Sequence, residues 1–210
     1  MNRRFLLESL LKKPRLPAEF QEVKYLESTG TQYIDTNLVA ATTMDFELKM
    51  WQSTYAKSKI FGSRESSSSQ SFALYLSNSS NLPVFNFYGN ILDIEGNFDN
   101  KILIFKGKIN NSNFKCSIDG TVYYTLPITS PLYSGNMYLM TYNNNGSPVL
   151  PNTLGQFRLY SCKIYDNNTI VRDFVPCYRK ADNVAGLYDL VNGVFYTNAG
   201  TGSFIVGGNV

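Results

Sequence analysis

The chain has 210 residues, with 19 lysines and arginines against 16 aspartates and glutamates, so its formal net charge is +3. This mild excess argues against nucleic-acid binding, because no dense basic stripe occurs outside residues 1 to 15. The absence of histidine excludes histidine acid–base catalysis, Ser-His and Cys-His nucleophile pairs and histidine-ligated metal sites. The length suffices for one large domain with its own core.

Residues 2 to 13 are the only stretch of the sequence that shows a convincing helical pattern, and Pro14 ends this pattern. Its apolar side chains recur three and four residues apart and form a strip that favours burial against another chain. We therefore expect residues 1 to 16 to be an amphipathic attachment segment. Packing back on the main domain and lying on a membrane surface are the alternatives. The residues of the strip are Phe5, Leu6, Leu7, Leu10 and Leu11.

No secretory signal peptide is expected, because the apolar run after the basic start is short, is broken by Glu8 and precedes no small-residue cleavage site. No stretch approaches the roughly 20 apolar residues of a membrane span. We expect a protein made in a reducing cytoplasm. Cys116, Cys162 and Cys177 are an odd set without CxxC spacing, which predicts three reduced thiols and no zinc cage.

From Val23 onward, short apolar or alternating runs are separated by Gly, Asn, Ser and Pro, as is typical of β-strands. Asp119-Gly120 and Asn192-Gly193 predict two hairpin tips. About a dozen strands at this spacing predict an all-β, two-sheet antiparallel jelly-roll sandwich over residues 17 to 210, preceded by the short helix. The first hairpin is predicted to place on one face Phe114, Cys116, Ile118, Thr121, Tyr123 and Thr125.

Three stretches carry a resemblance to a known family. They are LPAEFQEVKYLESTGTQYIDTN near the start, the hairpin FKCSIDGTVYYT, and residues 157 to 204. They resemble the concanavalin A-like, or laminin-G-like, jelly-roll domains of tailed phages, prophages and gut bacteria, over most of residues 17 to 204. The resemblance implies the fold and a virion or surface setting. Such sandwiches include lectins, glycosidases and structural modules, so the function must be argued from a site.

The stretch ILDIEG raises the question of catalysis, because on a strand Asp93 and Glu95 would point to the same face. Laminarinase-type glycosidases of this fold carry a Glu-x-Asp-x-Glu strand. Aligned to that pattern, Asp93 and Glu95 occupy the last two positions, and Ile91 occupies that of the nucleophile. A retaining mechanism needs two carboxylates about 5 Å apart. We therefore expect no glycan cleavage and no catalytic residue.

Two loops offer the aromatic and amide side chains that lectin sites use. The alternative is that the tyrosines are strand residues and the asparagines turn residues. PLYSGN contributes Tyr133 and Asn136, whereas TYNNNGSP contributes Tyr142, Asn143, Asn144 and Asn145. Calcium could bind the oxygen-rich turns, but neither has the regular acidic spacing of a dedicated site, so we expect no metal or other cofactor. These turns comprise Asp166, Asn167 and Asn168, and Asn97, Asp99 and Asn100.

Together, these features favour a non-enzymatic phage virion protein of the capsid, tail or fibre. Its lectin-like domain would decorate the particle or adhere to cell-surface or mucosal glycans. Residues 1 to 16 would attach it to other virion proteins or to its own copies. A bacterial surface carbohydrate-binding module is the first alternative, against which the missing signal peptide counts. A glycoside hydrolase is the second, against which the missing nucleophile counts.

Overall fold

The computed structural model describes residues 15–53, 59–65, 70–77, 82–96, 98–110, 112–128, 132–150 and 156–210. Every regular element in these ranges is a β-strand, which confirms the all-β prediction. The helix predicted for residues 2 to 13, with the attachment strip from Phe5 to Leu11, lies outside the described residues. Within those ranges no helix is long and apolar enough to cross a membrane.

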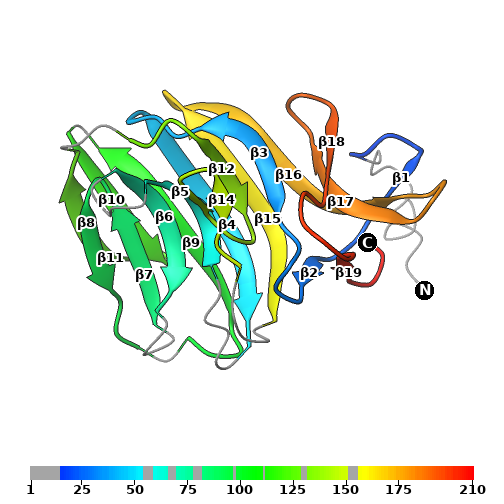
Figure 1. Cartoon of the computed structure of the whole chain (residues 1–210), viewed down its shortest axis with the longest axis horizontal. Helices are drawn as coiled ribbons and strands as arrows, with labels where there is room; N and C mark the ends of the chain where they lie inside the picture. The colour runs from blue at the N-terminus through cyan, green and yellow to red at the C-terminus, as the bar shows by residue number, and fades with distance from the viewer. Residues whose placement is uncertain are drawn as a thin grey trace, which may run out of the picture.

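The strands form two sheets, which Figure 1 shows as two layers. The path of the larger sheet runs through eight strands: β11 (Thr121–Pro127), β10 (Asn113–Ile118), β9 (Ile102–Asn110), β4 (Met44–Gln52), β15 (Phe157–Asp166), β16 (Thr169–Arg179), β17 (Val184–Asp189) and β18 (Val194–Thr197). Three short strands join this path at one end: β1 (Phe20–Glu22) beside β16, β2 (Leu26–Ser28) beside β15, and β19 (Ile205–Val206) beside β2.

The smaller sheet packs against β4, β9 and β10 of the larger one through contacts between aromatic rings. Its path runs through β14 (Ser147–Pro148), β13 (Asn143–Asn144), β5 (Lys59–Arg64), β6 (Ser71–Leu76), β7 (Pro83–Phe87) and β8 (Asn90–Asp93). A further strand, β12 (Asn136–Leu139), connects β5 to β3 (Ile34–Val39). The β13–β5 pair is parallel, and the other named strand pairs are antiparallel.

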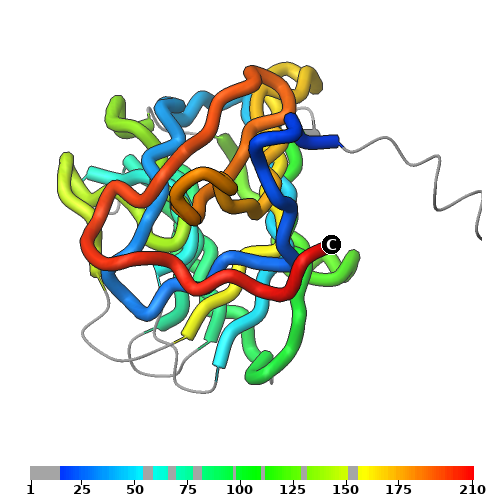
Figure 2. The backbone as a smooth tube through the Cα atoms, turned by 90° about the vertical axis from the view of Figure 1, so that its right-hand side faces the viewer, coloured from blue at the N-terminus to red at the C-terminus, as the bar shows by residue number. Residues whose placement is uncertain are grey.

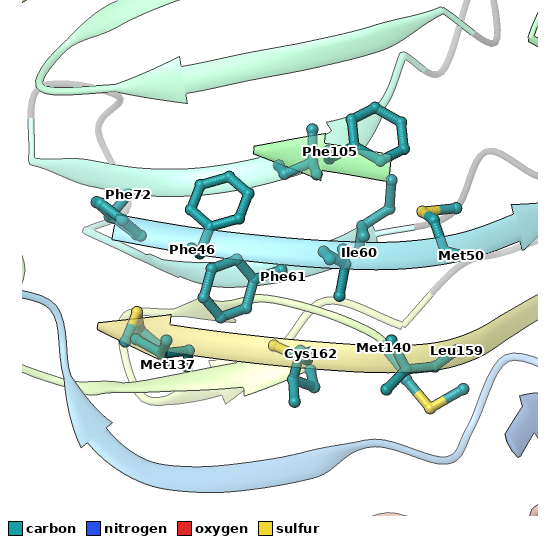
Figure 3. Packing of buried hydrophobic residues seen from close by; sticks show 14 of the residues in the cluster. Phe46, Met50, Ile60, Phe61, Phe72, Phe105, Met137, Met140, Leu159 and Cys162 are labelled. Carbon is teal, nitrogen blue, oxygen red and sulfur yellow. The ribbon is translucent and has the colours of Figure 1, made fainter. Parts of the chain in front are cut away.

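The core lies between the sheets and is largely aromatic. Along β4, inward residues alternate with outward ones, as the period of two in a strand requires. The ring of Phe46 lies 5.2 Å from that of Phe61 and 5.9 Å from that of Phe72, measured between centroids, and Figure 3 shows these side chains gathered between the sheets. Gly107 lies opposite Phe46. A Cβ there would come within 2.2 Å of the Phe114 ring, so a side chain at this position would displace the core.

Both predicted hairpin tips are confirmed. Asp119 and Gly120 connect β10 to β11 with φ angles of 49° and 84°, as a two-residue primed turn requires. Asn192 and Gly193 lie in the longer turn from β17 to β18, where Gly193 has a φ of 67°.

The predicted shared face of the first hairpin is wrong in part. A β-bulge shifts the register between Cys116 and Ser117, so Tyr124 rather than Tyr123 lies opposite Cys116. Beyond the bulge, Leu126 rather than Thr125 lies opposite Phe114. Nearly every residue of β11 is exposed. Its sequence therefore lacks the apolar alternation that would have revealed the extra residue.

An end module extends beyond the sandwich and comprises β1, β2, β17, β18 and β19 (Figure 1). The two ends of the described chain meet there, and Figure 2 shows their segments side by side. Val23 and Asn209 form a β-bridge, and β19 pairs with β2. A second, small apolar cluster of Leu16, Val175 and Cys177 packs against neighbouring aromatic side chains in this region.

The three cysteines are buried and free, which confirms the prediction of reduced thiols. Cys116 and Cys162 belong to the core between the sheets, whereas Cys177 belongs to the cluster of the end module. Burial raises the pKa of Cys177 to about 12, and it also raises the pKa of the other two thiols. Since the thiolate is the reactive form, these thiols are inert in the folded chain.

Candidate functional site

The outer face of the smaller sheet carries a cluster of polar and aromatic side chains. Tyr75 on β6 lies opposite Lys59 on β5, and Arg64 on β5 lies opposite Ser71. Phe72 and Leu74, the β6 residues that alternate with these, belong to the core. Tyr75 and Ser71 therefore point away from the core, and their cross-strand partners share that outer face.

Two tyrosines and two cations are packed together on this face. The rings of Tyr75 and Tyr142 have centroids 5.6 Å apart. Lys59 Nζ lies 5.0 Å from the centroid of Tyr75, and Arg64 Cζ lies 5.0 Å from that of Tyr142. Arg64 Nε also donates a hydrogen bond of 3.0 Å to Asn144 Oδ1. Cation–π contacts of this kind are strengthened by partial burial, so the guanidinium is held in a defined position.

The ionisation of the cluster is set mainly by burial. Burial, together with the smaller effect of the nearby charge of Arg64, lowers the pKa of Lys59 to about 8. Burial raises the pKa of Tyr75 and of Tyr142, with Arg64 opposing the shift in both. At neutral pH both tyrosines therefore keep their hydroxyl protons, and each can donate and accept a hydrogen bond.

Asn86 on β7 lies next to Tyr75, and the side-chain hydrogen bond between the two residues opposes the rise in the pKa of Tyr75 that burial causes. The Asn86 side chain is 0% exposed, and its Oδ1 accepts a hydrogen bond of 2.5 Å from Ser71 Oγ. Because Asn86 is fully buried, it helps to position Tyr75 and offers no surface of its own to a ligand.

The structure brings the two predicted binding loops together. Asn143 Nδ2 donates to the backbone oxygen of Asn136 at 2.8 Å, and Asn143 Oδ1 accepts from the backbone nitrogen of Gly146 at 2.8 Å. Asn143 thereby builds the turn and joins it to the neighbouring loop. Asn136 Nδ2 donates to Asp35 Oδ2 at 3.3 Å. Tyr133 is half-buried, with its ring over the backbone of Gly135.

Of the predicted residues, Tyr142 and Asn144 join the cluster directly. Tyr142 is 3% exposed, so its ring holds Arg64 and Tyr75 in place and offers little surface of its own. Sequence reasoning missed Arg64, Tyr75 and Asn86. Tyr75 and Asn86 could have been found from the alternation of polar and apolar residues along their strands. Tyr75 stands between the buried Leu74 and Leu76, and Asn86 stands between two buried phenylalanines.

The carboxylates of ILDIEG do not form a pair on one strand. Asp93 is the last residue of β8, and Glu95 lies beyond that strand. Ile94 between them is buried at 3% exposure, whereas Ile91, in the position of the nucleophile, is 55% exposed. Both carboxylates are exposed.

The first oxygen-rich turn is a hairpin turn. Asn167 and Asn168 have φ angles of 48° and 62° and connect β15 to β16. Asp166 Oδ1 accepts hydrogen bonds from Thr43 Oγ1 at 2.5 Å and from Asn167 Nδ2 at 3.2 Å. In the second turn, Asn97 lies outside the described residues. Across the described part of the chain, no group of three or more His, Cys, Asp or Glu residues is placed to hold a metal ion.

The fold and this face define an all-β, two-sheet antiparallel sandwich with a polar-aromatic cluster on its smaller sheet. No family model and no curated protein matches the chain. A solved structure of an HCR/D mutant is 11% identical, with 91% of this chain and 65% of that chain aligned at a TM-score of 0.43. The chain thus spans just under two thirds of that relative's length. A native glycosidic hydrolase is 10% identical, with 72% and 68% of the two chains aligned at a TM-score of 0.32.

Proposed function

We propose that the chain is a non-enzymatic, lectin-like protein whose jelly-roll sandwich binds a glycan on the outer face of the smaller sheet. The observation that carries this proposal is the packing of Tyr75 and Tyr142 with Arg64. Lectin sites combine aromatic faces, which stack on sugar rings, with fixed polar groups, which bind hydroxyls.

Each side chain has a defined part in the proposed site. The half-buried ring of Tyr75 stacks on the sugar. Arg64 donates through its terminal nitrogens, since its Nε atom is already bound to Asn144. Asn86 is a positioning residue, because it is fully buried and forms a side-chain hydrogen bond with Tyr75. Tyr142 is a positioning residue, because its ring is covered by its neighbours.

The proposal of binding without cleavage rests on the side chains that a glycosidase would need for catalysis. The chain has no histidine, and an isoleucine stands where a laminarinase-type nucleophile would be. The carboxylates of Asp93 and Glu95 are exposed. An exposed carboxylate lacks the burial that raises the pKa of a catalytic acid in glycosidases.

The proposed setting is a phage particle, with the domain displayed on the capsid, tail or fibre for decoration or adhesion. The resemblance of residues 17 to 204 to phage and prophage domains supports this setting. Residues 1 to 14 of the predicted attachment segment would attach the domain to other virion proteins or to a second copy, since Leu16 packs within the end module. A chain lacking residues 1 to 14 should keep its melting temperature but fail to self-associate or enter particles. Normal assembly of this truncated chain would contradict the attachment role, and a bacterial surface module would then be the better assignment.

A glycan array tests the proposed function. The purified chain should bind at least one glycan class, and Arg64→Gln should reduce that signal while leaving the melting temperature within a few degrees. A reducing-sugar assay on the bound glycan should detect no release. Absence of any bound glycan would contradict the binding proposal. Hydrolysis that Glu95→Gln abolishes would contradict its non-enzymatic part.

A further inference from the structure

The larger sheet carries a second apolar surface where its end strands join the end module. Phe174 and Leu187 belong to the core between the sheets, whereas Val175 and Tyr188, which follow them along β16 and β17, belong to or pack against the small second cluster. Successive side chains of a strand point to opposite faces of the sheet. These strands therefore present apolar side chains on both faces, and one of the two faces points away from the core.

Four partly buried side chains of this outer surface form what we call the aromatic patch. The ring centroid of Phe20 lies 5.0 Å from that of Tyr188 and 4.8 Å from that of Phe195. Tyr188 and Phe195 face each other across β17 and β18, and Leu190 completes the patch. Apolar side chains that remain partly in water gain free energy when another apolar surface covers them. The patch is thus suited to receive an apolar segment.

The described chain begins beside this patch. Leu16 is 8% exposed and belongs to the small cluster against which the patch packs. Arg15 Nε donates a hydrogen bond of 2.9 Å to Glu22 Oε2, so the chain is held on the end module from Arg15 onward. The apolar strip of the predicted attachment segment ends at Leu11. Five extended residues span at most about 18 Å, which keeps the strip within reach of such a patch.

We infer that the aromatic patch receives the apolar strip of residues 1 to 14 from a second copy of this chain, and that two copies exchange these segments reciprocally. The inference rests on the attachment role proposed above, and it names the partner and the receiving surface. It does not depend on the glycan site. The strip of one phenylalanine and four leucines offers apolar side chains three and four residues apart, which is the pattern by which a helix binds an apolar surface.

The short connection favours exchange between copies over folding back. Lys12, Lys13 and Pro14 join the strip to Arg15. Proline restricts its own φ and the conformation of the residue before it, and Arg15 is held by its ion pair with Glu22. A short, restricted hinge promotes domain swapping. Reciprocal exchange uses both segments and both patches, so the assembly closes at two copies.

Sedimentation equilibrium of the full chain and its point variants tests the inference. The wild-type chain should dimerise. Leu7→Asp/Leu11→Asp places charges in the strip, and Phe195→Ser or Tyr188→Ser removes a ring from the patch, so each should weaken dimerisation at least tenfold. Val122→Ser, at a side chain of β11 that is 55% exposed, is the control and should leave dimerisation unchanged. Melting temperatures identify any patch variant that fails to fold, and the strip variant changes no residue of the described domain.

Mixing two of the variant chains distinguishes exchange from folding back. The Phe195→Ser chain still supplies an intact strip, and the Leu7→Asp/Leu11→Asp chain still supplies an intact patch. The mixture should therefore form a 1:1 complex more tightly than either variant pairs with itself, because one of its two contacts is intact. A strip that folded back on its own chain would produce no such complex.

Three outcomes would overturn the inference: a wild-type chain that stays monomeric at every concentration, a dimer that both patch variants leave unchanged, or a mixture that forms no complex. The second outcome would show that the segments pair with each other. Glycan binding on the array has a separate readout and should be the same for Leu7→Asp/Leu11→Asp as for the wild type. Failure of the exchange is thus distinguishable from failure of the glycan proposal, and a monomer that still enters particles would assign the segment to another virion protein.

Discussion

The sandwich and the end module are stabilised by different means. The sandwich buries a continuous aromatic and aliphatic cluster between its two sheets. The end module adds only a few residues to that cluster, among them Leu26 and Leu187. It also has a much smaller apolar cluster of its own, backbone pairing between distant parts of the chain, and buried polar contacts. We therefore expect the loss of a single polar contact to destabilise the end module more than the sandwich.

Asp189 is the clearest polar anchor of the end module. Its side chain is 0% exposed, its Oδ1 accepts hydrogen bonds of 3.0 Å from the backbone nitrogens of Asp173 and Val191, and its Oδ2 lies 3.7 Å from Arg172 Nε. Arg172 also donates to the backbone oxygen of Thr36 at 3.2 Å. One carboxylate therefore joins the β17–β18 turn to β16 and, through Arg172, to β3 of the sandwich.

The largest effect is expected from the sandwich core. Phe46→Ala should lower the free energy of unfolding by about 3–5 kcal/mol, because it removes a ring at the centre of the aromatic cluster and leaves a cavity. Urea unfolding followed by the fluorescence of Trp51 measures this loss. Ile102→Ala, at a residue of the same sheet that is 49% exposed, is the matched control and should cost little. Similar losses in both variants would contradict the assignment of the core.

The next largest effect is expected in the end module. Asp189→Asn should cost about 3 kcal/mol, since it removes the buried carboxylate and leaves the partly buried charge of Arg172 without its partner. Asp182→Asn removes a carboxylate from the exposed Arg179–Asp182 pair and should cause no measurable change. Hydrogen exchange should show faster opening of β17 and β18 in Asp189→Asn, with β4 and β9 unchanged. Uniform destabilisation of the whole chain would break the distinction between the two regions.

A smaller, pH-dependent effect is expected from Lys59. Its pKa in the folded chain is about 8, against an ordinary value of 10.5. Between these two pKa values, Lys59 binds more protons in the unfolded chain than in the folded chain. The contribution of Lys59 to the free energy of unfolding therefore rises as the pH increases, by at most about 1.4 kcal/mol per pH unit. Urea unfolding at pH 8, 9 and 10 should show that Lys59→Met removes this rise. Identical pH profiles for the two chains would argue that Lys59 is not perturbed.

The smallest effect concerns local opening. In low urea, Cys177 should be modified by a thiol reagent faster than Cys116 and Cys162, because the end module opens at a lower free energy than the sandwich core. Mass spectrometry after timed labelling identifies which thiol has reacted. Full denaturation should expose three thiols. Equal labelling rates for all three in the native chain would show that the two regions open together.

Much of the sandwich was predictable because strands such as β4 and β10 alternate between buried and less buried residues and because its turns carry strong local signals such as Asp119-Gly120. The β-bulge opposite Cys116 was not predictable, since the exposed strand β11 shows no apolar pattern that would reveal it. The end module was also missed as a separate region. Its strands are short, and the pairing of Val23 with Asn209 joins residues far apart in the sequence, which a local pattern does not report.

The candidate site was predicted in part. Tyr142 and Asn144 were chosen from turn composition, and they do lie beside Arg64. The role expected of Tyr142 differs, because its ring is covered by side chains that come from other strands. Burial of this kind depends on how β5, β6 and the β13–β14 turn pack together, and no single stretch of sequence contains that information.

Calorimetric titration with the glycan selected on the array tests the central claim most directly. The wild-type chain, Tyr75→Ala and Tyr124→Ala would be compared. Tyr124 is 41% exposed on the edge strand β11 of the other sheet, so its loss controls for the removal of a tyrosine. We predict that Tyr75→Ala weakens binding about tenfold, through the loss of roughly 1.4 kcal/mol of aromatic stacking, and that Tyr124→Ala leaves it unchanged. Equal affinities for all three proteins would contradict a glycan site on the outer face of the smaller sheet.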